Sequence, residues 1–209
     1  MKCKSYLLAL LCILIFCEIG ISQYKSDAPQ HSLGLSVFSE FLGTPKHTPL
    51  YYLDNSFPTD NKGFAISIES AGEPFGLFRF SHMMELGYFH HQDLYQVLFI
   101  GYKPALELKL LNTIGAHVIM GLSYAHSLPT NQTYTFEDGE YEKKRNLGHP
   151  HFMPSLGAGV SLDLFGLLNV PAEIFIREEV FGLAPYATDG DFPITLNHKI
   201  SLGIKIFMD

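Results

Sequence analysis

The chain has no tryptophan, and its cysteines are confined to one end. Cys3, Cys12 and Cys17 all lie within the first seventeen residues, so the remainder of the chain can form no disulfide. A cross-linked framework of the kind that small secreted domains use is therefore excluded for that remainder. Its stability must come from packing and from backbone pairing.

Long hydrophobic runs and positive charge are also scarce. Beyond residue 22, no stretch approaches the eighteen or so consecutive apolar residues that a membrane-spanning helix needs. The sequence therefore predicts no transmembrane helix. Its 14 Lys and Arg residues face 21 Asp and Glu residues, a net charge of -7. That acidic balance argues against nucleic acid as a partner.

The first 22 residues have the pattern of a secretory signal peptide. Lys2 and Lys4 precede an apolar run, residues 6–16, that is too short to span a bilayer as a helix. The small residues Gly20 and Ser22 suit the positions before a cleavage site. We therefore predict that residues 1–22 direct export through the Sec route and are then removed.

Cleavage after Ser22 would leave one domain, residues 23–209, which fits the usual size of a single domain. That domain would contain no thiol, 12 of the 14 basic residues and 20 of the 21 acidic ones. A lipoprotein with Cys17 as its lipidated residue is the alternative. The bulky Phe16 directly before Cys17 fits that alternative poorly.

The composition favours strands. The chain has 17 Phe, 11 Tyr and 18 Gly residues and is only 17% charged, which fits many short strands better than helices or disorder. An alternation of apolar with small or charged residues, the period of a strand, recurs in eight segments. These are residues 32–41, 62–70, 76–89, 94–110, 114–126, 152–164, 172–181 and 194–207.

Two positions interrupt this regular pattern. Pro104 falls inside the fourth segment, and a proline donates no ladder hydrogen bond, so we expect a bulge or a local break there. In the seventh segment Glu178 falls on the apolar side and Phe175 on the polar side.

The connections between the segments alternate in length. Every second connection is a tight turn, at 71–75, 111–113 and 165–171. The others are long (42–61 and 127–151), medium (182–193) or short (90–93), and neither long connection falls at a tight-turn position. The pattern is typical of membrane barrels, in which short turns lie on the periplasmic side and loops outside. Both termini would then face the periplasm. We expect the charged run 137–145 to be a solvated loop tip or a hairpin around Asp138 and Gly139.

Each strand has an apolar face and a second face with small or charged residues. The composition of this second face distinguishes a membrane barrel from a soluble one. It combines seven acidic with six basic residues, interleaved with glycine and serine. They are Glu40, Glu69, Arg79, Glu85, Lys103, Glu107, Lys109, Asp163, Glu173, Arg177, Glu179, Lys199 and Lys205. Small residues and compensating charges suit a narrow lumen, whereas a solvated sheet face would rarely need so many glycines and serines.

These features predict an all-β fold, a closed antiparallel eight-stranded up-and-down transmembrane β-barrel. The stretch from Ser155 to Ser161 and the final strand from Leu196 to Phe207 resemble the strands of small bacterial outer-membrane β-barrel proteins. That resemblance implies location in a Gram-negative outer membrane, contact with lipid and lipopolysaccharide, and insertion by the barrel assembly machinery. The family usually ends on an aromatic residue, whereas here two residues follow Phe207.

Histidines supply the candidate binding chemistry. We expect one group in an outer loop, His90 and His91 with Asp93, and a second, His149 and His151, in another. If the loops met, these residues could bind a ligand. Solvated or hydrogen-bonded histidines are the commoner outcome at such positions, so we predict neither a metal nor another cofactor.

Serine and histidine also occur close together, as in barrel enzymes of the outer membrane. Ser81 precedes His82, and Ser123 lies near His126, but neither pair has the surrounding motif of those enzymes. Sequence alone cannot show whether nucleophile and base come within hydrogen-bond reach. We therefore assign no catalytic residue and predict that the protein is not an enzyme.

Three functional hypotheses remain. The first is a non-enzymatic outer-membrane protein with a structural or surface-binding role through its long outer loops. The second is a lipid-modifying enzyme that uses histidines at the barrel rim. The third is a soluble periplasmic ligand-binding barrel of the lipocalin kind, against which the missing tryptophan and the charged second face argue.

Overall fold

The computed structural model describes residues 31–42, 61–91, 95–110, 113–130, 133–137, 140–144, 147–184 and 195–208. The predicted signal peptide and Asp93 lie outside these ranges. The elements are β1 (His31–Leu42), β2 (Asn61–Ala71), β3 (Phe78–His91), β4 (Tyr95–Lys109), β5 (Ile114–Pro129), β6 (Thr133–Glu137), β7 (Glu140–Lys144), β8 (His149–Asp163), α3 (Phe165–Leu168), β9 (Ala172–Leu183) and β10 (Thr195–Met208).

Eight of the strands form a closed barrel. Their order around it is β1-β10-β9-β8-β5-β4-β3-β2, and every neighbouring pair is antiparallel. The first and last strands pair with each other along their length, from His31 with Met208 to Leu42 with Asn197. Closure leaves the barrel without an edge strand. The fold class predicted from the sequence is confirmed.

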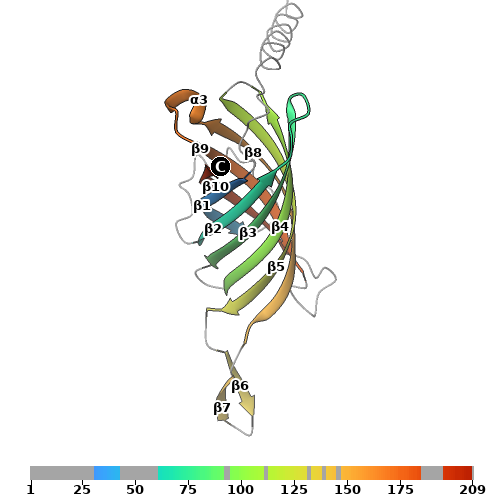
Figure 1. Ribbon diagram of the computed structural model, residues 1–209. Helices are drawn as coiled ribbons and strands as arrows, with labels where there is room; N and C mark the ends of the chain where they lie inside the picture. Colours follow the sequence, from blue (N-terminus) through green and yellow to red (C-terminus); the bar gives the residue numbers. More distant parts are fainter. Residues whose placement is uncertain are drawn as a thin grey trace, which may run out of the picture.

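The two ends of the barrel carry different elements. The single-turn helix α3 and the C-terminus lie toward one end of the barrel, and the two-stranded β6–β7 hairpin extends beyond the other (Figure 1). The hairpin pairs Glu137 with Glu140 at its tip, so the hairpin alternative for this charged run is the one adopted. Within the described residues, no helix is long and apolar enough to cross a membrane.

Pro104 breaks one ladder without causing a bulge. The β4–β5 pairing skips Lys103 and Pro104 and resumes in the same register, with Tyr102 opposite Leu122 and Ala105 opposite Ile119. On the other side, Pro104 pairs with His82 of β3. The expected bulge is therefore absent, because the missing N–H removes pairs on one side only and inserts no residue.

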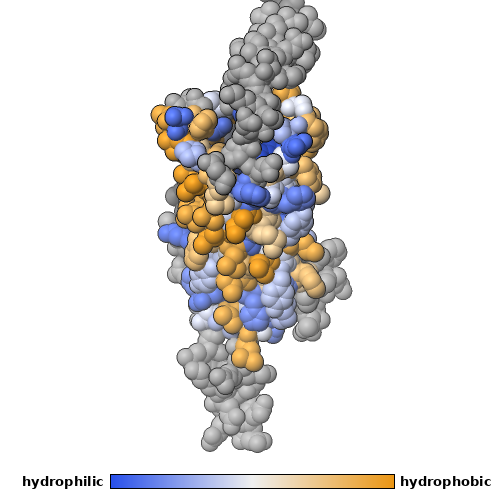
Figure 2. Space-filling view, in the orientation of Figure 1, coloured by the Kyte–Doolittle hydropathy of each residue, from blue (hydrophilic) through white to orange (hydrophobic). Residues whose placement is uncertain are grey.

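The outer wall of the barrel is apolar and the interior holds charged groups. Side chains that alternate along each strand, such as Leu156, Val160, Leu202 and Ile204, are exposed, whereas Lys103 and Glu179 are buried. Hydrophobic residues gather at mid-height on the wall shown in Figure 2. A soluble barrel has the reverse arrangement, so this pattern indicates a wall that faces lipid.

Glycines on the inner face allow the side chains of neighbouring strands to cross the narrow lumen. A Cβ atom at Gly159 would collide with the His117 side chain and with the backbone oxygen of Ile176. At Gly157 it would lie 2.6 Å from Cγ of Glu179. The glycines of β8 thus make room for His117 and Glu179 in the lumen.

Candidate functional site

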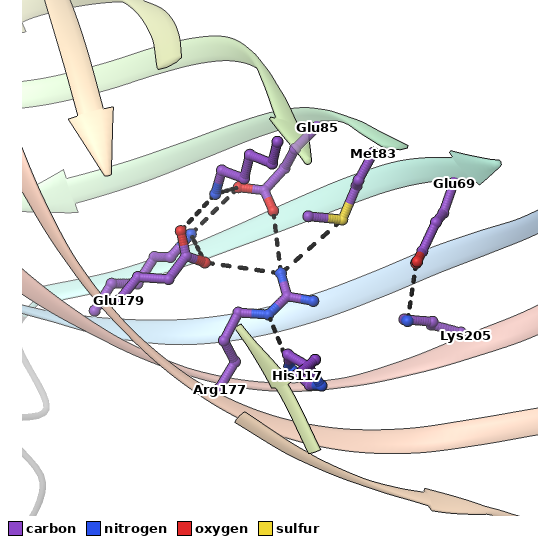
Figure 3. A network of polar contacts seen from close by, with 9 residues as sticks. Glu69, Met83, Glu85, His117, Arg177, Glu179 and Lys205 are labelled. Carbon is purple, nitrogen blue, oxygen red and sulfur yellow. Dashed lines mark hydrogen bonds and ion pairs between the residues drawn. The ribbon is translucent and has the colours of Figure 1, made fainter. Parts of the chain in front are cut away.

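The centre of the lumen holds a lysine between two carboxylates. Lys103 on β4 donates from Nζ to Glu85 Oε1 of β3 at 2.7 Å and to Glu179 Oε2 of β9 at 2.6 Å. The side chain of Lys103 is 0% exposed and those of its partners 3% and 1%. Their strands lie on different sides of the barrel, so the contacts span the lumen (Figure 3). Buried charges persist only when they are paired and hydrogen-bonded in this manner.

Two further cations complete this central cluster. Lys199 Nζ lies 2.9 Å from Glu179 Oε1 and 3.2 Å from Glu85 Oε1. An Nη atom of Arg177 lies 3.7 Å and 3.8 Å from oxygens of the same two residues, and its Nε donates to His117 Nε2 at 3.4 Å. Two acidic and three basic groups therefore hold one another in the middle of the barrel (Figure 3).

A second cluster, toward the turn end, has the opposite balance. Lys205 Nζ lies 2.8 Å from Glu69, 3.1 Å from Glu107 and 3.4 Å from Glu173. One basic group thus faces three acidic groups. The two clusters compensate each other in sign, as the near-neutral set of the sequence implies.

The remaining members of the predicted charged set lie nearer the barrel ends. Lys109 approaches Asp163 at 3.9 Å, with both side chains partly exposed. Arg79 donates from Nε to the Gly72 carbonyl at 3.2 Å. Glu40 is fully buried and is paired in register with Lys199.

The outer half of the lumen contains an apolar cluster that the sequence did not predict. Its core consists of Phe38, Ala65, Phe89, Tyr95, Val97, Phe99, Ala125, Met153, Phe181 and Leu183. Lys199 Nζ lies 5.0 Å from the ring centre of Phe38 and 5.6 Å from that of Phe99, so cation–π contacts join this cluster to the central charges. Phe38, Phe89 and Phe99 alternate together with the small and charged residues of their strands. That position in the alternation could have placed their side chains inside the barrel.

This packing closes the lumen. A cavity next to the aromatic rings has room for about one water molecule. It is lined by Phe89, Phe99, Met153, Ser155, Glu179, Phe181 and Lys199.

The structure places the predicted histidine groups in strands and not in loops. His90 and His91 end strand β3 instead of lying in a loop, and neighbours in a strand point to opposite faces. His149 and His151 likewise lie in β8. Within the described ranges no group of three or more metal-ligating side chains occurs.

The two candidate Ser and His pairs are also separated. Ser81 is buried in the lumen while His82 is exposed on the outer wall, where its Nδ1 is hydrogen-bonded to the Tyr102 hydroxyl. Ser123 likewise points inward, and His126 donates from Nε2 to the Leu147 carbonyl at 2.8 Å. Neither serine can therefore reach the histidine of its pair.

A different pair does meet at the outer rim. Ser127 Oγ on β5 and His151 Nε2 on β8 are hydrogen-bonded at 2.7 Å, and His151 is 5% exposed. Their sequence separation hides the pair, because only the β5–β8 register brings Ser127 beside His149 and His151.

A closed eight-stranded antiparallel barrel with an apolar outer wall and a packed, charged interior has the fold of the eight-stranded outer-membrane β-barrels. Neisserial surface protein A is similar to this chain with a TM-score of 0.50 at 9% identity, over 85% of this chain and 97% of that one. At such identity the likeness shows the fold alone.

Two further solved structures are similar at lower scores. The outer membrane enzyme PagL has a TM-score of 0.47 at 13% identity, and Ail, the attachment invasion locus protein of Yersinia pestis, has 0.45 at 9% identity. Both alignments cover 85% of this chain and 99% of the other. No family model and no curated protein matches the sequence.

Proposed function

We propose that this protein is a non-enzymatic barrel of the Gram-negative outer membrane that has a structural or surface-binding role through its outer loops. The observation that carries the proposal is the combination of a lipid-facing outer wall with a lumen closed by packed side chains. Such a barrel holds its loops at a membrane surface and offers no aqueous path through its centre.

The outer end of the barrel is the part available for binding. The β6–β7 hairpin lies there, beyond the barrel wall, while the C-terminus and α3 lie toward the opposite end (Figure 1). We assign the hairpin end to the cell surface and both termini to the periplasm, after export through the Sec route. Lipid and lipopolysaccharide would surround the wall, and the barrel assembly machinery would insert it.

Surface labelling combined with gel migration tests the proposal. A cysteine introduced in the 131–146 segment should react with a membrane-impermeant maleimide on intact cells, and the labelled protein should migrate faster unheated than boiled. A cysteine in the 111–113 turn serves as the matched control and should react only after the outer membrane is permeabilised. Protein that fractionates with the soluble periplasm without detergent would overturn the proposal.

A hydrolase is the second candidate, favoured by the hydrogen bond between Ser127 Oγ and His151 Nε2. A serine within reach of a histidine base is the minimal arrangement for nucleophilic catalysis. A fluorophosphonate probe should then label the folded protein but not its Ser127→Ala variant. Equal absence of labelling in both proteins removes this candidate and leaves the non-enzymatic one.

A further inference from the structure

The outer wall of the barrel carries two polar pairs among apolar neighbours. On β9, Glu178 projects outward with 39% of its side chain exposed, and its Oε1 lies 3.6 Å from Nδ1 of His198 on β10. On β3, His82 stacks on Tyr102 of β4, with ring centres 5.8 Å apart and planes 17° apart. The Tyr102 hydroxyl is hydrogen-bonded to Nδ1 of the same imidazole.

Both pairs include groups in the middle of their strands. Tyr102 is the central residue of β4, and Glu178 lies beside the midpoint of β9, where Ile176 and Val180 follow the same outward alternation. In a lipid-facing wall these positions lie in the hydrocarbon region instead of at the polar interface. Ionisable groups at that depth are costly, and they usually mark a functional contact with a polar partner.

The two pairs lie on opposite sides of the barrel. We call the outer surface along two paired strands a seam. The β9–β10 seam, with Glu178 and His198, and the β3–β4 seam, with His82 and Tyr102, are four strands apart in either direction around the closed order. No single chain can therefore bring them together, but a neighbouring copy can present one seam to the other.

The two pairs are chemically complementary. In the tautomer in which Tyr102 donates to Nδ1, the His82 imidazole has its proton on Nε2 and can donate it outward. The Glu178 carboxylate has a second oxygen that can accept such a bond. Ala158 is the register partner of Glu178 on β8. Its side chain is small, so the stacked rings of His82 and Tyr102 from another copy can approach the Glu178 carboxylate.

We propose that copies of this chain associate side by side in the membrane through these two seams. Glu178 of one copy accepts a hydrogen bond from His82 of the next copy, while its own His198 lies 3.6 Å from the other carboxylate oxygen. The seams are different surfaces on opposite sides, so the contact is heterologous and extends into rows instead of closing a symmetric dimer. The proposal rests on the membrane location proposed above.

Disulfide cross-linking between copies tests this arrangement. Ile176, 54% exposed on β9, and Phe80, 44% exposed on β3, each lie two residues before Glu178 and His82 on the same outward faces, and the two strands run in the same direction. We expect the Ile176→Cys/Phe80→Cys variant, oxidised in membranes, to give a ladder of dimers, trimers and larger species without reductant. Each single-cysteine variant should give no cross-linked dimer, because a head-to-tail contact places different residues opposite each other.

A matched pair on the intervening strands controls for random collision. Val37 on β1 and Val118 on β5 are 62% and 52% exposed and lie between the two seams on either side. Cross-linking of the test pair no greater than that of the Val37→Cys/Val118→Cys variant would overturn the proposal. So would a dimer formed by Ile176→Cys alone, because that product indicates a symmetric contact.

Removing the polar contact separates association from folding. We expect Glu178→Leu, combined with the two cysteines, to lower the cross-linked fraction by about five-fold, the loss expected for one membrane hydrogen bond. Heat-modifiable migration should persist in that variant, because an apolar residue suits the lipid-facing wall. An unchanged ladder would contradict the role of Glu178. Soluble, non-heat-modifiable parent protein would instead refute the membrane location itself.

Discussion

Single residues in the lumen of this barrel are constrained by charge and by space at the same time. Lys103 is fully buried and has two carboxylates within 2.7 Å, so the three groups depend on one another for stability. Gly157 and Gly159 leave the room that the Glu179 and His117 side chains occupy.

Replacing Lys103 by Met should lower the free energy of unfolding by about 3 kcal/mol, because Glu85 and Glu179 would lose a buried counter-charge. Urea unfolding in lipid vesicles, followed by gel migration, measures this. The additional change Glu85→Leu should lower the stability further, because Lys199 and Arg177 would then share the single carboxylate of Glu179. Lys62→Met, at an exposed lysine, is the control and should leave unfolding unchanged. A tolerated Lys103→Met would show that the central network contributes little.

At the scale of elements, the sequence was informative wherever period-two alternation determines a strand. All eight barrel strands were predicted to within a few residues, because a wall with one face in lipid and one in a narrow lumen imposes the alternation on every strand. Which inward residues pack together depends on register between strands distant in sequence. That is why the Ser127 and His151 pair and the aromatic cluster around Phe89 and Phe99 were not found.

The β6–β7 hairpin can be separated from the barrel. The β5–β8 ladder continues to Ser127 opposite His149, below the hairpin, so barrel closure does not require it. Replacing residues 131–146 by a short Gly and Ser linker should leave heat-modifiable migration unchanged. Loss of the folded band in this deletion would show that the hairpin contributes to the barrel, whereas a matched deletion within β8 should abolish the band.

At the scale of the whole barrel, side chains fill the lumen from end to end. Charged clusters fill the middle and the turn end of its lumen, and aromatic side chains fill the outer half. We therefore expect no stepwise conductance when folded protein is added to a planar bilayer, with an open porin as the positive control. Regular single-channel steps from heat-modifiable protein would show that the lumen opens.

Lipid quenching of introduced tryptophans tests the central claim most directly, that apolar side chains face lipid and charged ones face a closed lumen. The chain has no tryptophan of its own, so each signal belongs to one position. In vesicles containing brominated lipid, we predict strong quenching of Val160→Trp and Leu202→Trp, and weak quenching of Phe175→Trp and Phe99→Trp. Equal quenching at all four positions, or none at Val160 and Leu202, would contradict the account.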